Sequence, residues 1–121
     1  MLSEANFVTL HLPLNEKSEA LVGKDEIALM KPSAYIINTS RAQVIDECAL
    51  YEALEEERIA GAALDVYAKA SPPKDLPFFK LDNVITTPWI ACNTGENTGN
   101  MNLICVENVL RGLEDKSLCM Q

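Results

Sequence analysis

Four short apolar runs, each followed by polar or turn residues, constrain the fold of this chain most strongly. Their residues are almost wholly apolar, whereas a strand with one face in water alternates apolar and polar side chains. Such runs are typical of parallel strands that are buried on both faces by helices. The four expected strands are Phe7–Leu12, Ala34–Asn38, Ile59–Val66 and Asn83–Thr87.

Segments with helical periodicity separate or follow these runs. The first is interrupted by Gly23, which predicts two short helical pieces instead of one long helix. The second follows Asp46, a residue type that caps helix N-termini. The expected helical segments are 19–30, 47–58 and a longer one that begins near Thr94 or Glu96 and ends at Leu113. The order β-α-β-α-β-β-α predicts an α/β fold with a doubly wound parallel sheet and helices on both faces.

Charge and composition argue against several kinds of partner. The chain has 18 acidic and 10 basic residues, a net charge of -8, whereas nucleic acids and anionic membranes attract clustered cations. We expect no membrane span, because no apolar run is long enough, and no signal peptide, because the N-terminus lacks a basic region. The four cysteines form no C-x-x-C pair and no zinc-ligand spacing, so we expect no metal site and reduced thiols in a cytoplasmic protein.

Polar residues at the ends of the expected strands are the candidates for ligand binding. In open parallel sheets, ligands bind at the carboxyl ends of the strands, because the loops there converge on one edge. The residues at these ends are His11 and Pro13, Thr39 to Arg41, Asp65, and Pro88 with Trp89.

Motifs at these same places resemble those of a known family. They are VTLHLP, MKPSAYIINTSR, IAGAALDV and NVITTP. Together they resemble the C-terminal half of the NAD-binding domain of D-isomer specific 2-hydroxyacid dehydrogenases, which include phosphoglycerate dehydrogenases and glyoxylate or hydroxypyruvate reductases. The resemblance extends from about Leu2 to Leu118. It implies a Rossmann-type sheet, NAD as cofactor and oxidation of the CH–OH group of 2-hydroxy acids.

The first half of that domain has no counterpart in this sequence. The family's G-x-G-x-x-G turn, which binds the pyrophosphate, is absent, and the only closely spaced glycines are Gly95 and Gly99. We therefore expect residues 1–121 to form a single partial domain without the phosphate-binding half or the substrate domain. The acidic residue that separates NAD from NADP binding belongs to that half, so the choice between them stays open.

The resemblance implies three catalytic positions, of which one is retained. Arg41 matches the family's arginine, whose guanidinium binds the carboxylate and carbonyl of a 2-keto acid. The family's glutamate aligns with Ala70 and its histidine with Trp89, so the acid–base pair is lost. Arg41 has a structural alternative as a surface or capping residue that pairs with Asp46 or Glu47. A lone tryptophan is also a common core or interface residue.

The positions beside the cofactor are better preserved. Asp65 matches the aspartate that accepts a hydrogen bond from the nicotinamide carboxamide, although a strand-end aspartate also caps nearby backbone. His11 is the only histidine, and the family carries a non-catalytic histidine at this place. The cofactor-binding positions implied by the resemblance are Leu12, Pro13, Thr39, Ser40, Arg41 and Asp65.

Three functions agree with this pattern. The chain is an NAD-dependent reductase of 2-keto acids, a non-catalytic remnant or subunit that binds another protein, or a domain cut from a longer enzyme. A small 2-keto or 2-hydroxy acid is a partner only in a complete enzyme. The edge of the strand Phe7–Leu12 would be open in this half-sheet, which predicts a homo-oligomer or pairing with another chain through that edge.

Overall fold

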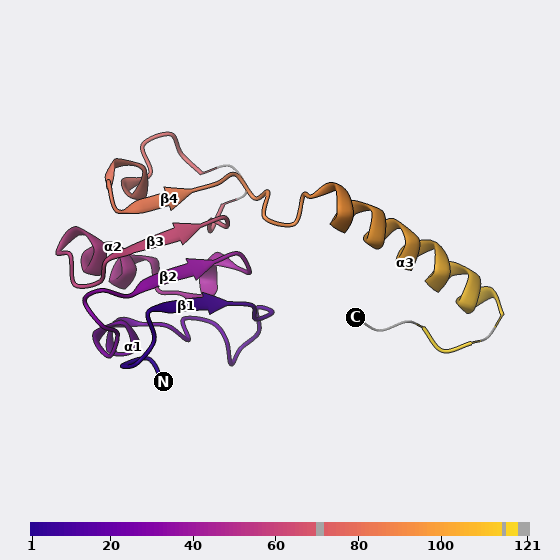
Figure 1. Cartoon of the computed structure of the whole chain (residues 1–121), viewed down its shortest axis with the longest axis horizontal. Helices are drawn as coiled ribbons and strands as arrows, with labels where there is room; N and C mark the ends of the chain where they lie inside the picture. The colour runs from indigo at the N-terminus through magenta and orange to yellow at the C-terminus, as the bar shows by residue number, and fades with distance from the viewer. Residues whose placement is uncertain (70–71, 115, 119–121) are drawn as a thin grey trace. The chain divides into compact units, whose positions relative to one another are not determined.

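The computed structural model describes residues 1–69, 72–114 and 116–118 of the chain. It divides into two compact units, Met1–Trp89 and Ile90–Gln121. The first contains the sheet and the second contains the long C-terminal helix (Figure 1). The expectation that residues 1–121 form one domain stays a prediction. Among the described residues, no helix combines the length and apolar character needed to cross a membrane.

The first unit is built on a four-stranded parallel sheet in the order β1-β2-β3-β4 (Figure 1). The register aligns Val8 with Ile36, Ile36 with Ala62, and Ala62 with Val84. The parallel α/β fold predicted from the apolar runs is therefore confirmed, although every strand is shorter than expected. The strands are β1 (Phe7–Leu10), β2 (Tyr35–Asn38), β3 (Gly61–Leu64) and β4 (Val84–Thr86).

The connection between β1 and β2 differs from the prediction. The expected pair of helical pieces over 19–30 is only one short helix, α1 (Lys24–Ala28), preceded by turns. Residues before the helix are held by the chain that follows β2: the Ala20 amide donates to the Gln43 carbonyl, and Val22 forms a parallel bridge with Ile45. These tertiary hydrogen bonds replace the intrahelical ones that the periodicity indicated.

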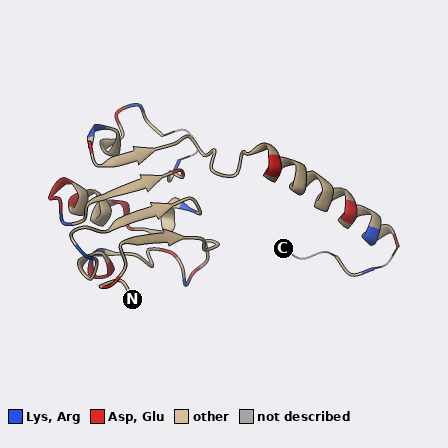
Figure 2. Ribbon diagram, viewed as in Figure 1, with Lys and Arg blue, Asp and Glu red and all other residues tan. Residues whose placement is uncertain are grey.

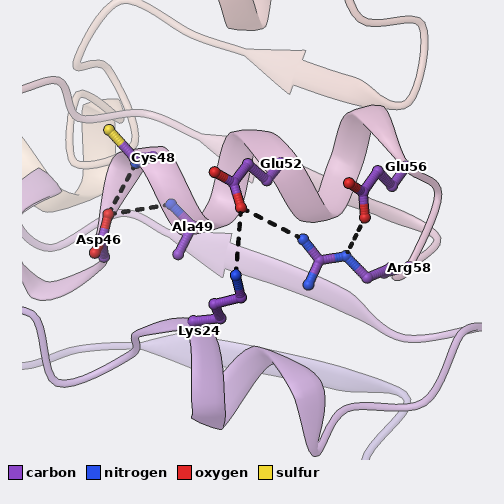
Figure 3. Close-up of polar contacts among 7 residues, drawn as sticks. All are labelled: Lys24, Asp46, Cys48, Ala49, Glu52, Glu56 and Arg58. Carbon is purple, nitrogen blue, oxygen red and sulfur yellow. Dashed lines mark hydrogen bonds and ion pairs between the residues drawn. The ribbon is translucent and has the colours of Figure 1, made fainter.

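Helix α2 (Glu47–Glu55) connects β2 to β3 and begins as predicted. The Asp46 carboxylate caps it by accepting hydrogen bonds from the Cys48 and Ala49 amides at 2.9 and 3.1 Å (Figure 3). Exposed ion pairs link the helix to its surroundings, since Glu52 lies near both Lys24 and Arg58 (Figure 3). Two 3-10 turns, η1 (Ala42–Val44) and η2 (Pro77–Lys80), complete the connections of this unit.

The core lies between one face of the sheet and helices α1 and α2. Ile36 and Ala62 on that face join Ile27 of α1 and the apolar side of α2 in a single buried cluster. The opposite face is open within this unit, since Phe7 is 66% and Ile85 68% exposed. Phe7 stacks on Tyr35 there, with ring centroids 5.6 Å apart. The helices of this unit therefore bury one side of the sheet.

The second unit consists mainly of α3 (Gly95–Leu113). Thr94 caps it by accepting a 3.1 Å hydrogen bond from the Asn97 amide, as one of the two expected start sites predicted. No residue of α3 is buried, although it carries a broad set of apolar side chains. Gly95 and Gly99, the only closely spaced glycines, both lie in its first turns.

Candidate functional site

The turn after β2 is fixed by the side chain of Asn38. This asparagine is buried, and its amide nitrogen donates to the Arg41 carbonyl at 2.9 Å. Its amide oxygen accepts from both the backbone amide and the hydroxyl of Ser40, at 3.0 and 2.9 Å. Thr39, Ser40 and Arg41 therefore form one closed turn around a buried polar group.

Arg41 extends from this turn with its guanidinium at the surface. It donates a 2.7 Å hydrogen bond to the carbonyl of Ser40, its own neighbour. Among the described residues, no ion pair joins Arg41 to Asp46 or Glu47, and the Asp46 carboxylate is engaged in capping α2. The alternative of a structural ion pair therefore has no support in this structure.

Asp65 joins the ends of three strands just after β3. Its backbone amide donates to the Asn38 carbonyl at 3.0 Å, and its carbonyl accepts from the Trp89 amide at 3.0 Å. Its carboxylate is buried and accepts a 2.5 Å hydrogen bond from the Thr87 hydroxyl. Asp65 is thus a strand-end residue that bonds side chain and backbone to the neighbouring strands.

Tyr67 lies next to this junction. Its hydroxyl lies 3.2 Å from the Leu64 carbonyl and 3.0 Å from the Thr87 carbonyl, to which it donates. Burial raises the pKa of the Tyr67 phenol, and the charge of Asp65 adds to the rise. The phenol is therefore a neutral donor over the physiological range and holds the β3 and β4 ends together.

Trp89 has an unusual backbone for a bulky residue. Its φ is +54°, in the left-handed region that side chains with a Cβ disfavour by about 1–2 kcal/mol. Its amide is held there by the Asp65 and Thr87 carbonyls, at 3.0 and 3.1 Å. The indole remains 59% exposed, so burial of the ring does not offset the strain. Strained backbone that its surroundings enforce is common where side chains face ligands.

A pocket of about 200 Å³ brings two of the predicted positions together. Arg41 and Trp89 both line it, and Lys69 contributes a second cation. Figure 2 shows that Lys and Arg are otherwise scattered over several elements. The described residues that line the pocket are Arg41, Ala42, Gln43, Val66, Tyr67, Lys69 and Trp89, with no carboxylate or imidazole among them.

The remaining predicted positions lie at the same carboxyl edge or outside the described residues. Leu12 and Pro13 follow β1, where the Ser18 hydroxyl donates to the Pro13 carbonyl at 2.7 Å. His11 is hydrogen-bonded to the Thr9 hydroxyl over 2.9 Å. Ala70, the position of the family glutamate, lies outside the described residues. Within the described part of the chain, no group of three His, Cys, Asp or Glu side chains is placed to hold a metal ion.

Sequence reasoning missed three residues of this region. The sequence pattern places Asn38 only at the end of a strand, although a polar residue that closes an apolar run is a signal for a side chain that bonds the following turn. Tyr67 and Lys69 carried no signal of their own. Their place in the pocket depends on how the loop after β3 returns toward the β2 turn.

Comparison with known proteins gives a consistent picture. The family model of the D-isomer specific 2-hydroxyacid dehydrogenase, NAD binding domain, matches residues 1–91. D-3-phosphoglycerate dehydrogenase of Methanocaldococcus jannaschii is 47% identical over 115 residues, which cover 93% of this chain and 22% of that protein. Glyoxylate reductase of Korarchaeum cryptofilum is 41% identical over 110 residues, covering 91% of this chain and 33% of the relative.

Solved structures agree with these relatives. The NAD-complexed D-isomer specific 2-hydroxyacid dehydrogenase of Lactobacillus delbrueckii ssp. bulgaricus superposes with a TM-score of 0.86 at 35% identity. The match covers 96% of this chain and 39% of that one. The chain thus spans between about a fifth and two fifths of the length of these proteins.

Proposed function

This chain belongs to the D-isomer specific 2-hydroxyacid dehydrogenase family through its NAD-binding domain. We propose that it forms the half of such a domain that contacts the nicotinamide of NAD. We also propose that it has an anion-binding site that transfers protons poorly. The observation that carries this proposal is the shared pocket of Arg41 and Trp89, in which the described lining offers a guanidinium but no imidazole or carboxylate.

The polar edge of the sheet fits the nicotinamide end of NAD better than its phosphate end. Thr39, Ser40 and Asp65 present hydroxyl, backbone and carboxylate groups at neighbouring strand ends, beside the loop of Leu12 and Pro13. None of the glycines has a positive φ, and the closely spaced pair lies inside α3, so the described residues form no glycine-rich phosphate cradle. We therefore expect weak NAD binding by this chain alone.

Arg41 and Trp89 differ in the chemistry that they can supply in the pocket. The dihydronicotinamide of NADH, when bound, would supply the hydride that reduces a carbonyl group, leaving NAD⁺. The Arg41 guanidinium orients the carboxylate of a 2-oxo acid through paired hydrogen bonds. The Trp89 indole donates a hydrogen bond but does not exchange its proton near neutral pH. The absence of a general acid costs about 10²–10⁴-fold in rate.

Two measurements test this proposal. Calorimetry with NADH, and NADH oxidation with glyoxylate, hydroxypyruvate and 3-phosphohydroxypyruvate, are expected to give weak binding and no measurable turnover. Robust turnover by this chain would overturn the proposed loss of proton transfer. A longer protein that also supplies the phosphate-binding half and the substrate domain is expected to gain about 10²–10⁴-fold in rate from Trp89→His with Ala70→Glu. Trp89→His with Ala70→Gln is the control that lacks the carboxylate.

The edge of the sheet favours a second function, association with another chain. β1 is an edge strand of the described sheet, and Phe7 at its start is among the most exposed apolar residues of the first unit. Open apolar edges pair readily with other strands. We therefore propose a homo-oligomer, or a complex with another chain, through the strand Phe7–Leu10. Light scattering is expected to give a mass above that of the monomer, and Phe7→Lys is expected to lower it. A stable monomer at high concentration would exclude self-association.

The three cysteines that the structure describes, Cys48, Cys92 and Cys105, are free thiols. Free thiols persist in reducing compartments, and this supports the further proposal of a cytoplasmic location. Cys119 lies outside the described residues.

A further inference from the structure

The pocket that Arg41 and Trp89 line has features that the reduction of a small oxo acid does not use. A single guanidinium is sufficient to hold one carboxylate, but Lys69 adds a second cation to the same lining. The chain as a whole carries a net charge of -8. The pocket differs, because its described lining contains two cationic side chains and no carboxylate, so its local charge is positive. The lining is therefore suited to an anion.

The walls of the pocket are apolar and aromatic. Ala42 and Val66 line it and are buried, while Tyr67 and Trp89 contribute rings. The volume of about 200 Å³ exceeds the roughly 150 Å³ of an apolar cavity that holds one benzene molecule. The pocket thus has room for one six-membered ring with a carboxylate, whereas the smallest oxo acids would leave much of it to water.

The backbone of Trp89 places its indole at the pocket, where the ring can contact a ligand. Two carbonyl acceptors, from Asp65 and Thr87, hold its amide while φ is +54°. The ring is more than half exposed and lines a second pocket beside Thr86 and Pro88 as well. The backbone fixes where the indole leaves the chain, and a flat aromatic face open to solvent is a stacking surface for a planar ligand.

From these observations we propose that the pocket binds a planar aromatic carboxylate, with the ring stacked against Trp89 and the carboxylate held between Arg41 and Lys69. This inference rests on the proposed function in one respect, that Arg41 is an anion-binding group. It differs in the class of ligand, which is selected by its ring as well as by its charge. Binding requires neither NAD nor a proton transfer.

The first test uses the full chain and three small probes. Trp89 is the only tryptophan, so its indole N–H gives a single NMR resonance that reports on the pocket. Benzoate is expected to shift this resonance in a saturable manner. Benzamide, which has the same ring without the charge, is expected to bind at least about 10-fold more weakly. Cyclohexanecarboxylate, which keeps the charge but is not planar, is expected to bind about 3- to 10-fold more weakly. Equal affinities for benzoate and benzamide, or no saturable shift, would overturn the proposal.

The second test removes each contact in turn. Arg41→Gln and Lys69→Gln are each expected to weaken benzoate binding, by about 10-fold and about 3- to 10-fold at low salt. Trp89→Leu, followed by calorimetry, is expected to abolish the preference for benzoate over cyclohexanecarboxylate. Lys74→Gln is the matched control, because Lys74 is an exposed lysine of the same loop. An equal loss with Lys74→Gln would assign the binding to general surface charge and refute the site.

A third comparison separates this inference from the proposed function. Pyruvate and phenylpyruvate are both 2-oxo acids and differ by a ring. Tighter binding of phenylpyruvate, by about 3- to 10-fold, is the expected result. Equal binding of both, lost in Arg41→Gln, would refute the aromatic ligand and leave the oxo acid site intact. Arg41-dependent binding of benzoate without binding of either oxo acid would refute the oxo acid site alone. The absence of binding by all of them would overturn both.

Discussion

The hydroxyl of Thr87 donates a 2.5 Å hydrogen bond to Oδ1 of Asp65, and this contact joins the ends of β3 and β4. Asp65 is only 3% exposed, so its carboxylate depends on protein donors for its stability in the folded state. The bond also fixes the residue whose carbonyl holds the amide of Trp89. The junction therefore couples the stability of the sheet to the placement of the indole.

Thr87→Val should lower the free energy of unfolding by about 1–3 kcal/mol, because it removes a donor from a buried acceptor while keeping the shape of the side chain. Urea denaturation measures this change. Thr9→Val is the matched control: Thr9 is an exposed strand residue bonded to His11, and its substitution should stay within about 0.5 kcal/mol of the parent. Similar losses for both variants would contradict a special role for the Thr87 hydroxyl.

Asn38→Ala should destabilise the protein by about 2–4 kcal/mol, because three hydrogen bonds around the Arg41 turn are lost together. It should also weaken benzoate binding, since the turn that positions Arg41 is released. Denaturation and NMR titration give the two readouts. Asn83→Ala, which removes one bond to the Leu54 carbonyl, should cost less stability and leave benzoate binding unchanged. Unchanged benzoate binding in Asn38→Ala would show that the turn holds its form without the amide.

Gly61→Ala should be more costly than a glycine substitution elsewhere. A Cβ at this position would collide with the Asn83 carbonyl and approach the Tyr35 ring to 3.0 Å. We expect a loss of about 1–3 kcal/mol in the free energy of unfolding, because the backbone of β4 cannot move away freely. Gly112→Ala, in α3 and open to solvent, should instead increase helicity by circular dichroism, since alanine favours helix by about 1 kcal/mol. A neutral Gly61→Ala would show that β3 and β4 can separate without cost.

Glu57→Gly should stabilise the end of α2. Glu57 has a φ of +52°, and the amides of Glu57 and Arg58 donate to the Leu54 and Ala53 carbonyls in the manner of a helix that ends in a left-handed residue. Glycine relieves this strain and should add about 1 kcal/mol to the free energy of unfolding. Glu57→Ala removes the charge but not the strain, and should gain less. Thermal unfolding distinguishes the two, and an equal gain would attribute the effect to charge.

Raising the pH should destabilise the fold through Tyr67. Burial raises the pKa of this phenol, so the folded protein keeps a proton that the unfolded chain begins to lose near pH 10. The free energy of unfolding therefore falls as the pH rises from about 10 upward, and Tyr67→Phe should reduce this slope. Tyr51→Phe is the comparison. The pKa of Tyr51 is raised mainly by its hydrogen bond to Glu55 on an exposed helix face, where solvent screening makes its contribution smaller. A steeper effect from Tyr51 than from Tyr67 would contradict this assignment.

The class of fold and the family could both be predicted from local residue patterns. Non-alternating apolar runs are typical of parallel strands, and this local property predicted the parallel sheet. The helix caps at Asp46 and Thr94 could also be predicted from the sequence, because a capping side chain bonds amides only two or three residues away. The motifs that indicated the family are contiguous segments, and the match over residues 1–91 agrees with them.

The assembly of the site, in contrast, depends on contacts that form only in the folded chain. Residues 19–23 are not helical, because amides of Ala20 and Val22 bond the carbonyls of Gln43 and Val44, which are distant in sequence. Lys69 joined Arg41 and Trp89 in one pocket because the loop after β3 returns to the β2 turn. The amide of Trp89, whose φ is positive, is bonded to the carbonyl of Asp65, which follows the neighbouring strand β3. Each of these depends on contacts between segments far apart in the chain, and local residue patterns carry no information about such contacts.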